Sequence, residues 1–96
     1  MAAIDVTFKP ATSQKRTFTA VSAQSTALDS WTNVVRVYAT QDCYLAFGES
    51  PTAVATGTDV FLPAGQAEYF RVDGGCKIAV IRDSADGNLF ITEMTR

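Results

Sequence analysis

The feature that most constrains the fold is a series of short runs in which apolar and polar side chains alternate residue by residue. In the run at 34–40, Val35 and Val37 fall on one side of the chain, and Arg36 and Tyr38 fall on the other. This period of two is typical of a β-strand with one buried face, because successive side chains of a strand point to opposite faces. No run keeps a helical period over a normal helix length. The chain is therefore expected to fold as β-sheet.

Turn-forming residues divide the sequence into eight candidate strands. The expected strands cover residues 4–8, 16–22, 34–40, 43–48, 59–63, 67–72, 76–83 and 88–95. Pro10 is expected to end the first strand, and the turns at 41–42 and 86–87 are expected to form hairpins. Residues 49–58 are expected to form a surface loop or a poorly regular edge. Short antiparallel strands joined by tight turns predict an all-β fold, an antiparallel β-sandwich or jelly roll in a single domain over 1–96.

Two segments break the strand pattern or leave a choice. Residues 23–33 are expected to form a loop or one short helical turn, with Trp31 packed against the core as a plug. Residues 1–15 fit either an extended arm or exchanged strand that lies across a neighbour, or a strand that completes its own sheet. In either case 96 residues leave room for one core only.

The side-chain inventory argues against catalysis and against a metal site. The chain has no histidine, so a Ser-His or Cys-His pair cannot be built. Cys43 and Cys76 are far apart in sequence without a CxxC spacing, and we expect two buried thiols, with a disulfide as the alternative. The acids of 83–88 have the wrong spacing for a calcium loop. We therefore expect a protein that is not an enzyme, without a cofactor or a metal.

Charge and hydropathy narrow the partners. The net charge is −2 and the eight Lys and Arg are spread along the chain, so we expect no nucleic-acid partner. No run approaches the ~18 apolar residues of a membrane span, and the first residues lack the pattern of a signal peptide. We expect a soluble protein made in the cytoplasm, with no membrane partner.

Some apolar side chains must remain on the surface, because 47% of the residues are apolar and only 19% are charged. The strands at 76–82 and 88–94 are apolar on both faces, so they are expected either to lie centrally under another layer or to carry an interface, and contact between subunits is the simpler explanation. Aromatic and arginine side chains at outward positions are the types that protein interfaces favour. The candidate interface residues are Tyr38, Tyr44, Tyr69, Arg71, Ile81 and Phe90. An alternative use of the rings is a sugar-stacking platform made of Trp31, Tyr38, Tyr44 and Tyr69.

The stretch LPAGQAEYFRV at 62–72 is the clearest corner of the expected fold. Pro63 ends one strand and Gly65 turns the chain into the next. Tyr69 and Arg71 then share the outward side of that next strand. Replacing Tyr69 or Arg71 by Ala is expected to weaken assembly more than folding.

Four runs carry a family resemblance: VRVYATQDCYLAFGESPTA, FLPAGQAEYFRV, KIAVIRD and LFITEMT. They resemble a small protein that recurs among the structural genes of tailed bacteriophages and prophages. The resemblance covers residues 34–95, and the first 33 residues match nothing we can place. It contains no motif that assigns a role to an individual residue.

The resemblance implies a virion protein, namely a head decoration or cement protein of jelly-roll type that clamps neighbouring capsid subunits. The expected partners are further copies of the chain, as a dimer or trimer, and the major capsid protein or another virion protein. Two alternatives stay open: an accessory protein of the head-tail junction or tail, and a carbohydrate- or ligand-binding sandwich.

Overall fold

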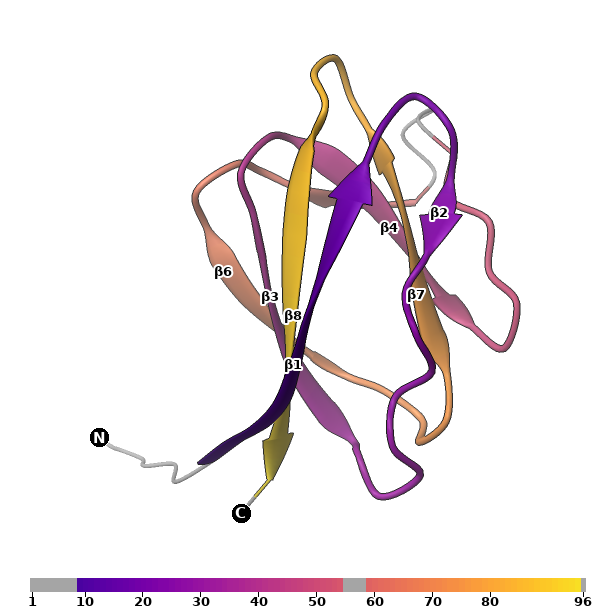
Figure 1. The fold of residues 1–96 in the computed structure, drawn as a ribbon, viewed down its shortest axis with the longest axis vertical. Helices are drawn as coiled ribbons and strands as arrows, with labels where there is room; N and C mark the ends of the chain where they lie inside the picture. The colour runs from indigo at the N-terminus through magenta and orange to yellow at the C-terminus, as the bar shows by residue number, and fades with distance from the viewer. Residues whose placement is uncertain (1–8, 55–58, 96) are drawn as a thin grey trace.

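Two four-stranded antiparallel sheets, called sheet A and sheet B below, make up the fold (Figure 1). They are seen in a computed structural model that describes residues 9–54 and 59–95. The strands are β1 (Lys9–Phe18), β2 (Ala23–Gln24), β3 (Val34–Ala39), β4 (Cys43–Gly48), β5 (Val60–Leu62), β6 (Ala67–Arg71), β7 (Lys77–Arg82) and β8 (Gly87–Thr95). The described residues contain no helix, so the predicted all-β class is confirmed.

Each sheet pairs strands that are distant in the sequence. Sheet A has the order β1-β8-β3-β6, and sheet B has the order β2-β7-β4-β5. All neighbouring strands are antiparallel. Of the consecutive strands, β4 and β5 alone are neighbours in one sheet. Every other connection between the described strands therefore carries the chain from one sheet to the other.

The two predicted hairpins are consequently wrong. The turn at 41–42 joins β3 in sheet A to β4 in sheet B, and the turn at 86–87 joins β7 in sheet B to β8 in sheet A. Turn residues favour a local reversal of the chain, but they do not decide which strand becomes the neighbour. Gly87 is needed for space, because an added Cβ would lie 2.8 Å from Cζ of the buried Phe18 ring.

The first part of the chain also differs from the prediction. The strand expected at 4–8 lies outside the described residues. Pro10 does not end a strand, since β1 runs through it and takes in the start of the strand expected at 16–22. Pro10 is tolerated because β1 lies at the edge of sheet A and its register with β8 shifts between Pro10 and Ser13. An irregular edge strand has room for a residue without an amide hydrogen.

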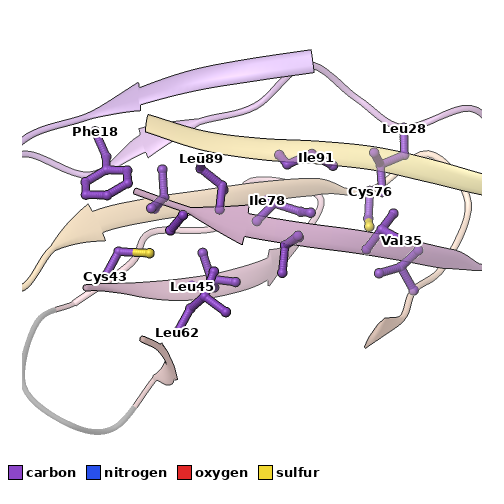
Figure 2. Close-up of a cluster of buried hydrophobic side chains, with 14 residues drawn as sticks. Phe18, Leu28, Val35, Cys43, Leu45, Leu62, Cys76, Ile78, Leu89 and Ile91 are labelled. Carbon is purple, nitrogen blue, oxygen red and sulfur yellow. The ribbon is translucent and has the colours of Figure 1, made fainter. Parts of the chain in front are cut away.

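The inward side chains of both sheets meet in one core, which gives a two-layer, sandwich-like arrangement (Figure 2). The alternation at 34–40, 43–48 and 76–82 predicted the inward positions of these strands correctly. The buried cluster consists of Phe18, Leu28, Val35, Val37, Ala39, Cys43, Leu45, Leu62, Val72, Cys76, Ile78, Val80, Leu89 and Ile91. Cys43 and Cys76 are free thiols at opposite ends of the cluster, so the buried-thiol prediction is confirmed and the disulfide alternative is not.

The connection at 25–33, between β2 and β3, reaches the core through a residue other than the expected one. Trp31, the predicted plug, is 49% exposed. Leu28 is buried instead, and its amide donates a hydrogen bond to the carbonyl of Cys76 at 2.8 Å. This hydrogen bond fixes the connection to the start of β7, and the side chain of Trp31 stays about half exposed.

A buried carboxylate holds the same connection from the other sheet. Glu93 of β8 points inward, in phase with Ile91, and is 2% exposed. Its Oε1 accepts hydrogen bonds from the amide of Asp29, at 3.0 Å, and from the hydroxyl of the buried Thr32. Glu93 therefore anchors the connection to sheet A. In the alternating run of β8, Glu93 falls on the same side as Leu89 and Ile91, and this position is the sequence signal for its inward orientation.

Candidate interaction surface

The six predicted interface residues fall on opposite sides of the molecule. Four of them lie on the outer face of sheet A: Tyr38, Tyr69, Arg71 and Phe90. The other two, Tyr44 and Ile81, are paired on the outer face of sheet B. The four-ring sugar platform is not assembled, because Tyr38 and Tyr44 face away from each other and Trp31 lies on the 25–33 connection. The two outer faces are therefore separate candidate surfaces.

Strand register arranges the outer face of sheet A in rows. One row crosses β1, β8 and β3 with Lys15, Phe90 and Tyr38 opposite one another. Residues that are directly opposite in an antiparallel pair share a face, so these three side chains point the same way. The exposed fraction is 40% for Phe90 and 58% for Tyr69, which lies on the edge strand β6. This face thus presents aromatic rings to its surroundings.

The next two rows add hydroxyl and guanidinium groups. The second row runs through Ser13, Thr92, Arg36 and Tyr69. The hydroxyls of Ser13 and Thr92 lie 3.2 Å apart, within hydrogen-bond distance. In the third row Arg71 of β6 lies beside Val34 and Met94.

An open hollow of about 520 Å³ lies over the first two rows. Phe90 and Tyr38 line it together with Lys15 and Arg36. The hollow therefore combines an aromatic lining with two positive charges.

The charge on this face has a single sign. Lys15, Arg36 and Arg71 all lie on the outer side of sheet A. The strands of sheet A carry two carboxylates, Glu68 and Glu93, and both occupy positions on the inner side, opposite core residues of β3. We call the outer surface formed by Lys15, Arg36, Tyr38, Tyr69, Arg71 and Phe90 the basic face. Within the strands the structure describes, the basic face has no carboxylate.

Two members of the basic face were not among the predicted site residues. The alternation at 34–40 places Arg36 beside Tyr38 on the outward side, and that local signal was sufficient to find it. Lys15 had no such signal. It joins the face because β1 pairs with β8, a contact between residues far apart in the sequence.

The outer face of sheet B carries aromatic side chains at one edge and is partly covered elsewhere. Tyr44 of β4 stands beside Phe61 of β5, with ring centroids 5.3 Å apart. The Tyr44 hydroxyl donates a hydrogen bond to Asp83 at 3.3 Å, and the pKa of Tyr44 is raised by desolvation and by the charge of Asp83. Phe61 is 46% exposed. This face thus offers a small aromatic surface at the edge of the sheet.

The segment at 49–54 lies against another part of sheet B. The amide of Ala53 donates a hydrogen bond to Ser22 Oγ at 2.9 Å, and Gln24 Nε2 donates one to the carbonyl of Pro51 at 2.9 Å. Ala79 points outward and is fully buried, and Gln24, which binds the carbonyl of Pro51, is its partner on β2. The chain itself therefore occupies part of this face.

A second hollow, of about 360 Å³, is lined by Phe47, Arg71 and Cys76, among others. The pKa of the Cys76 thiol is raised, mainly by burial. A thiol with a raised pKa is a poor nucleophile, because the thiolate is the reactive form. This hollow therefore lacks an activated cysteine.

The rest of the described chain adds no metal-binding group. Residues 9–54 and 59–95 contain no cluster of three or more His, Cys, Asp or Glu side chains that could hold a metal ion. Within the same residues no helix is long and apolar enough to span a membrane.

Comparisons of the chain with protein-family models, with curated proteins and with solved structures found no match. The two outer faces are the candidate functional surfaces of the described residues.

Proposed function

We propose that this chain is a non-enzymatic structural protein of a tailed-phage virion and that it acts through protein contacts on the basic face. The observation that carries the proposal is the single-signed, aromatic surface on one side of a small two-sheet scaffold. Tyr, Phe and Arg are the side chains that interfaces favour. The proposed role is capsid decoration, in which the protein stabilises the head by binding neighbouring capsid subunits.

The strand order supports a jelly-roll assignment for the fold. In an eight-stranded jelly roll the first strand pairs with the last, the second with the seventh, the third with the sixth and the fourth with the fifth. Alternate pairs of this series lie in opposite sheets. The pairs β1–β8 and β3–β6 fall in sheet A, and the pairs β2–β7 and β4–β5 fall in sheet B. Jelly rolls are a recurrent architecture of viral capsid proteins. The strand order therefore agrees with the virion role that the sequence resemblance implies.

A dimer or trimer is part of the proposal. The aromatic surface of Phe61 and Tyr44 on sheet B is a candidate contact between copies, since the two rings lie side by side and Phe61 is exposed. Of the segment considered as an arm, 1–15, the described part lies in β1 beside β8 of its own sheet. That placement favours contact between copies through sheet faces over exchange of that part of the chain.

The test is binding of the purified protein to particles of the encoding phage that lack it, with the bound protein localised by electron microscopy. We expect density on the head surface and a dimer or trimer by light scattering. Tyr69→Ala should reduce binding with little change in the melting temperature. Val21→Ala is the matched control, because Val21 is 72% exposed on the connection from β1 to β2.

The remaining outcomes separate the alternatives. Density at the portal or tail would replace the decoration role by the head-tail junction or tail role. A strict monomer that binds no particle would refute the virion proposal. Hits on a glycan array that are lost with Tyr38→Ala would favour the carbohydrate-binding alternative, for which the hollow beside Tyr38 and Phe90 is the observation.

A further inference from the structure

We infer that the basic face is a docking surface for an acidic surface of another protein. The inference depends on the proposed function in one respect, which is that the partner is taken to be another protein of the virion. Its own basis is the distribution of charge and of aromatic rings over the outer side of sheet A.

The charge distribution runs against the overall charge of the chain. The net charge is −2, yet three cations and no carboxylate lie on the basic face within the described strands. Of the two carboxylates in these strands, Glu93 is buried and hydrogen-bonded, and Glu68 occupies an inner-side position on the edge strand β6. A surface of one sign attracts a surface of the opposite sign and repels its own kind. The matching partner surface is therefore acidic.

The three cations follow a diagonal across the four strands. From the register, Lys15 and Arg36 are two strands and one row apart, which standard strand spacings make about 12 Å between backbone positions. Arg36 and Arg71 are one strand and one row apart, or about 8 Å. Phe90 and Tyr38 lie in the same row as Lys15, and Tyr69 lies beside Arg36 in the next row. A partner must therefore present spaced acids with apolar groups between them.

This pattern fits a protein better than the other polyanions. Cations about 8–12 Å apart are sparse beside the ~3.4 Å charge spacing of one nucleic-acid strand. Exposed rings interleaved with arginine are typical of the residues that carry binding energy in protein interfaces. Two copies of this chain placed face to face would bring Lys15, Arg36 and Arg71 against the same cations. The partner is therefore a different surface from the basic face itself.

The size of the face limits the strength of one contact. Four strands and three rows span a flat area of roughly 400 Å². A stable binary interface buries about 800 Å² on each partner. A single contact is therefore weak and sensitive to salt, and firm attachment needs several copies bound side by side on one assembled surface.

The experiment removes the charges without removing the rings. In the triple variant Lys15→Gln, Arg36→Gln and Arg71→Gln, binding to decoration-free particles should fall about tenfold or more, and its dependence on salt should flatten. Lys77→Gln is the matched control, because Lys77 lies on sheet B, and it should bind within about twofold of the wild type. Particle binding that keeps its strength and salt dependence in the triple variant overturns the inference but leaves the proposed function standing.

A second measurement tests the chemistry of the face without the particle. The purified chain is titrated with poly-L-glutamate, with heparin and with duplex DNA while backbone resonances are followed by NMR. We expect poly-L-glutamate to shift resonances of β1, β3, β6 and β8, and the triple variant to lose these shifts. If the wild type binds poly-L-glutamate in this way but binds no particle, the proposed function fails and the inference stands.

Three results overturn the inference. The first is a response of sheet A to heparin or DNA and none to poly-L-glutamate, which would assign the face to a polysaccharide or a nucleic acid. The second is a response to poly-L-glutamate confined to other strands. The third is a change of oligomeric state in the triple variant, which would assign the face to a second copy of the chain.

Discussion

The anchor made by Glu93 gives the sharpest test of what holds the two sheets together. Its carboxylate accepts hydrogen bonds from the amide of Asp29 and the hydroxyl of Thr32, and both Glu93 and Thr32 are almost completely buried. In Glu93→Ala the Thr32 hydroxyl loses its acceptor inside the protein, whereas the amide of the exposed Asp29 can bind water instead. A buried polar group left without a partner costs about 1–3 kcal/mol, which is the loss we expect at Thr32. Against a typical total of roughly 5–15 kcal/mol, this loss is large.

A double-mutant cycle separates the hydrogen bond from the loss of side-chain volume. Thr32→Val removes the hydroxyl and keeps the shape, and Glu93→Gln keeps an acceptor and removes the charge. A hydrogen bond to a charged group contributes about 1.5–3 kcal/mol and a neutral one about 0.5–1.5 kcal/mol. We therefore expect a coupling energy between the two positions of about 1 kcal/mol or more. Urea denaturation of the four proteins, followed by circular dichroism, measures it.

Glu68→Ala is the control for this cycle. Glu68 is also an inner-side carboxylate of sheet A, but it is exposed on the edge strand β6. Its removal should change the free energy of unfolding by no more than about 0.5 kcal/mol. The reasoning is refuted if Glu93→Ala costs as little as Glu68→Ala, or if the coupling energy is zero within error.

Four further predictions concern single residues. Gly74→Ala should lower the free energy of unfolding by about 3 kcal/mol, because the added Cβ would lie 2.6 Å from the backbone carbonyl carbon of Ser30. Gly75→Ala has open space around the added Cβ but a φ of +83°, so it should cost about 1 kcal/mol. Thermal unfolding compares the two variants, and the reverse order would contradict the packing. Burial, with a smaller effect of a neighbouring carboxylate, raises the pKa of Cys43 from 9.0 to about 12, so its thiol should resist Ellman's reagent until the protein unfolds. Since the unfolded thiol ionises first, the free energy of unfolding should fall as the pH rises from 9.0 to about 12, and a flat urea profile there would refute this. The pKa of Tyr44 is raised by desolvation and by Asp83, so Asp83→Asn should lower the absorbance titration midpoint of Tyr44 toward 10.0.

Strand interiors were predictable because their signal is local. The inward set at 34–40 and 43–48 follows from period two alone, and the structure places Val35, Val37 and Leu45 in the core as expected. The outward sides of Tyr38 and Tyr44 follow by the same reasoning. None of this needs knowledge of which strand lies beside which.

Strand partners were not predictable, because they depend on contacts between distant residues. The turns at 41–42 and 86–87 contain good turn residues, but neither joins neighbouring strands of a sheet. For the same reason the sequence could not separate Tyr38 from Tyr44, which end on different sheets, or bring Lys15 next to Phe90. Pro10 failed as a strand end because a local rule cannot tell an edge strand from a central one.

Strand β8 has a consequence for how the protein is made. It lies between β1 and β3, so sheet A cannot join these two strands until residues 87–95 have left the ribosome. Until then β1 has no neighbour in its sheet, and the inward side of β3 lacks Leu89 and Ile91. Pairing of such distant strands is slow compared with local folding. A ribosome-bound chain stalled before residue 87 should therefore remain sensitive to protease, and protection should begin only after β8 has emerged.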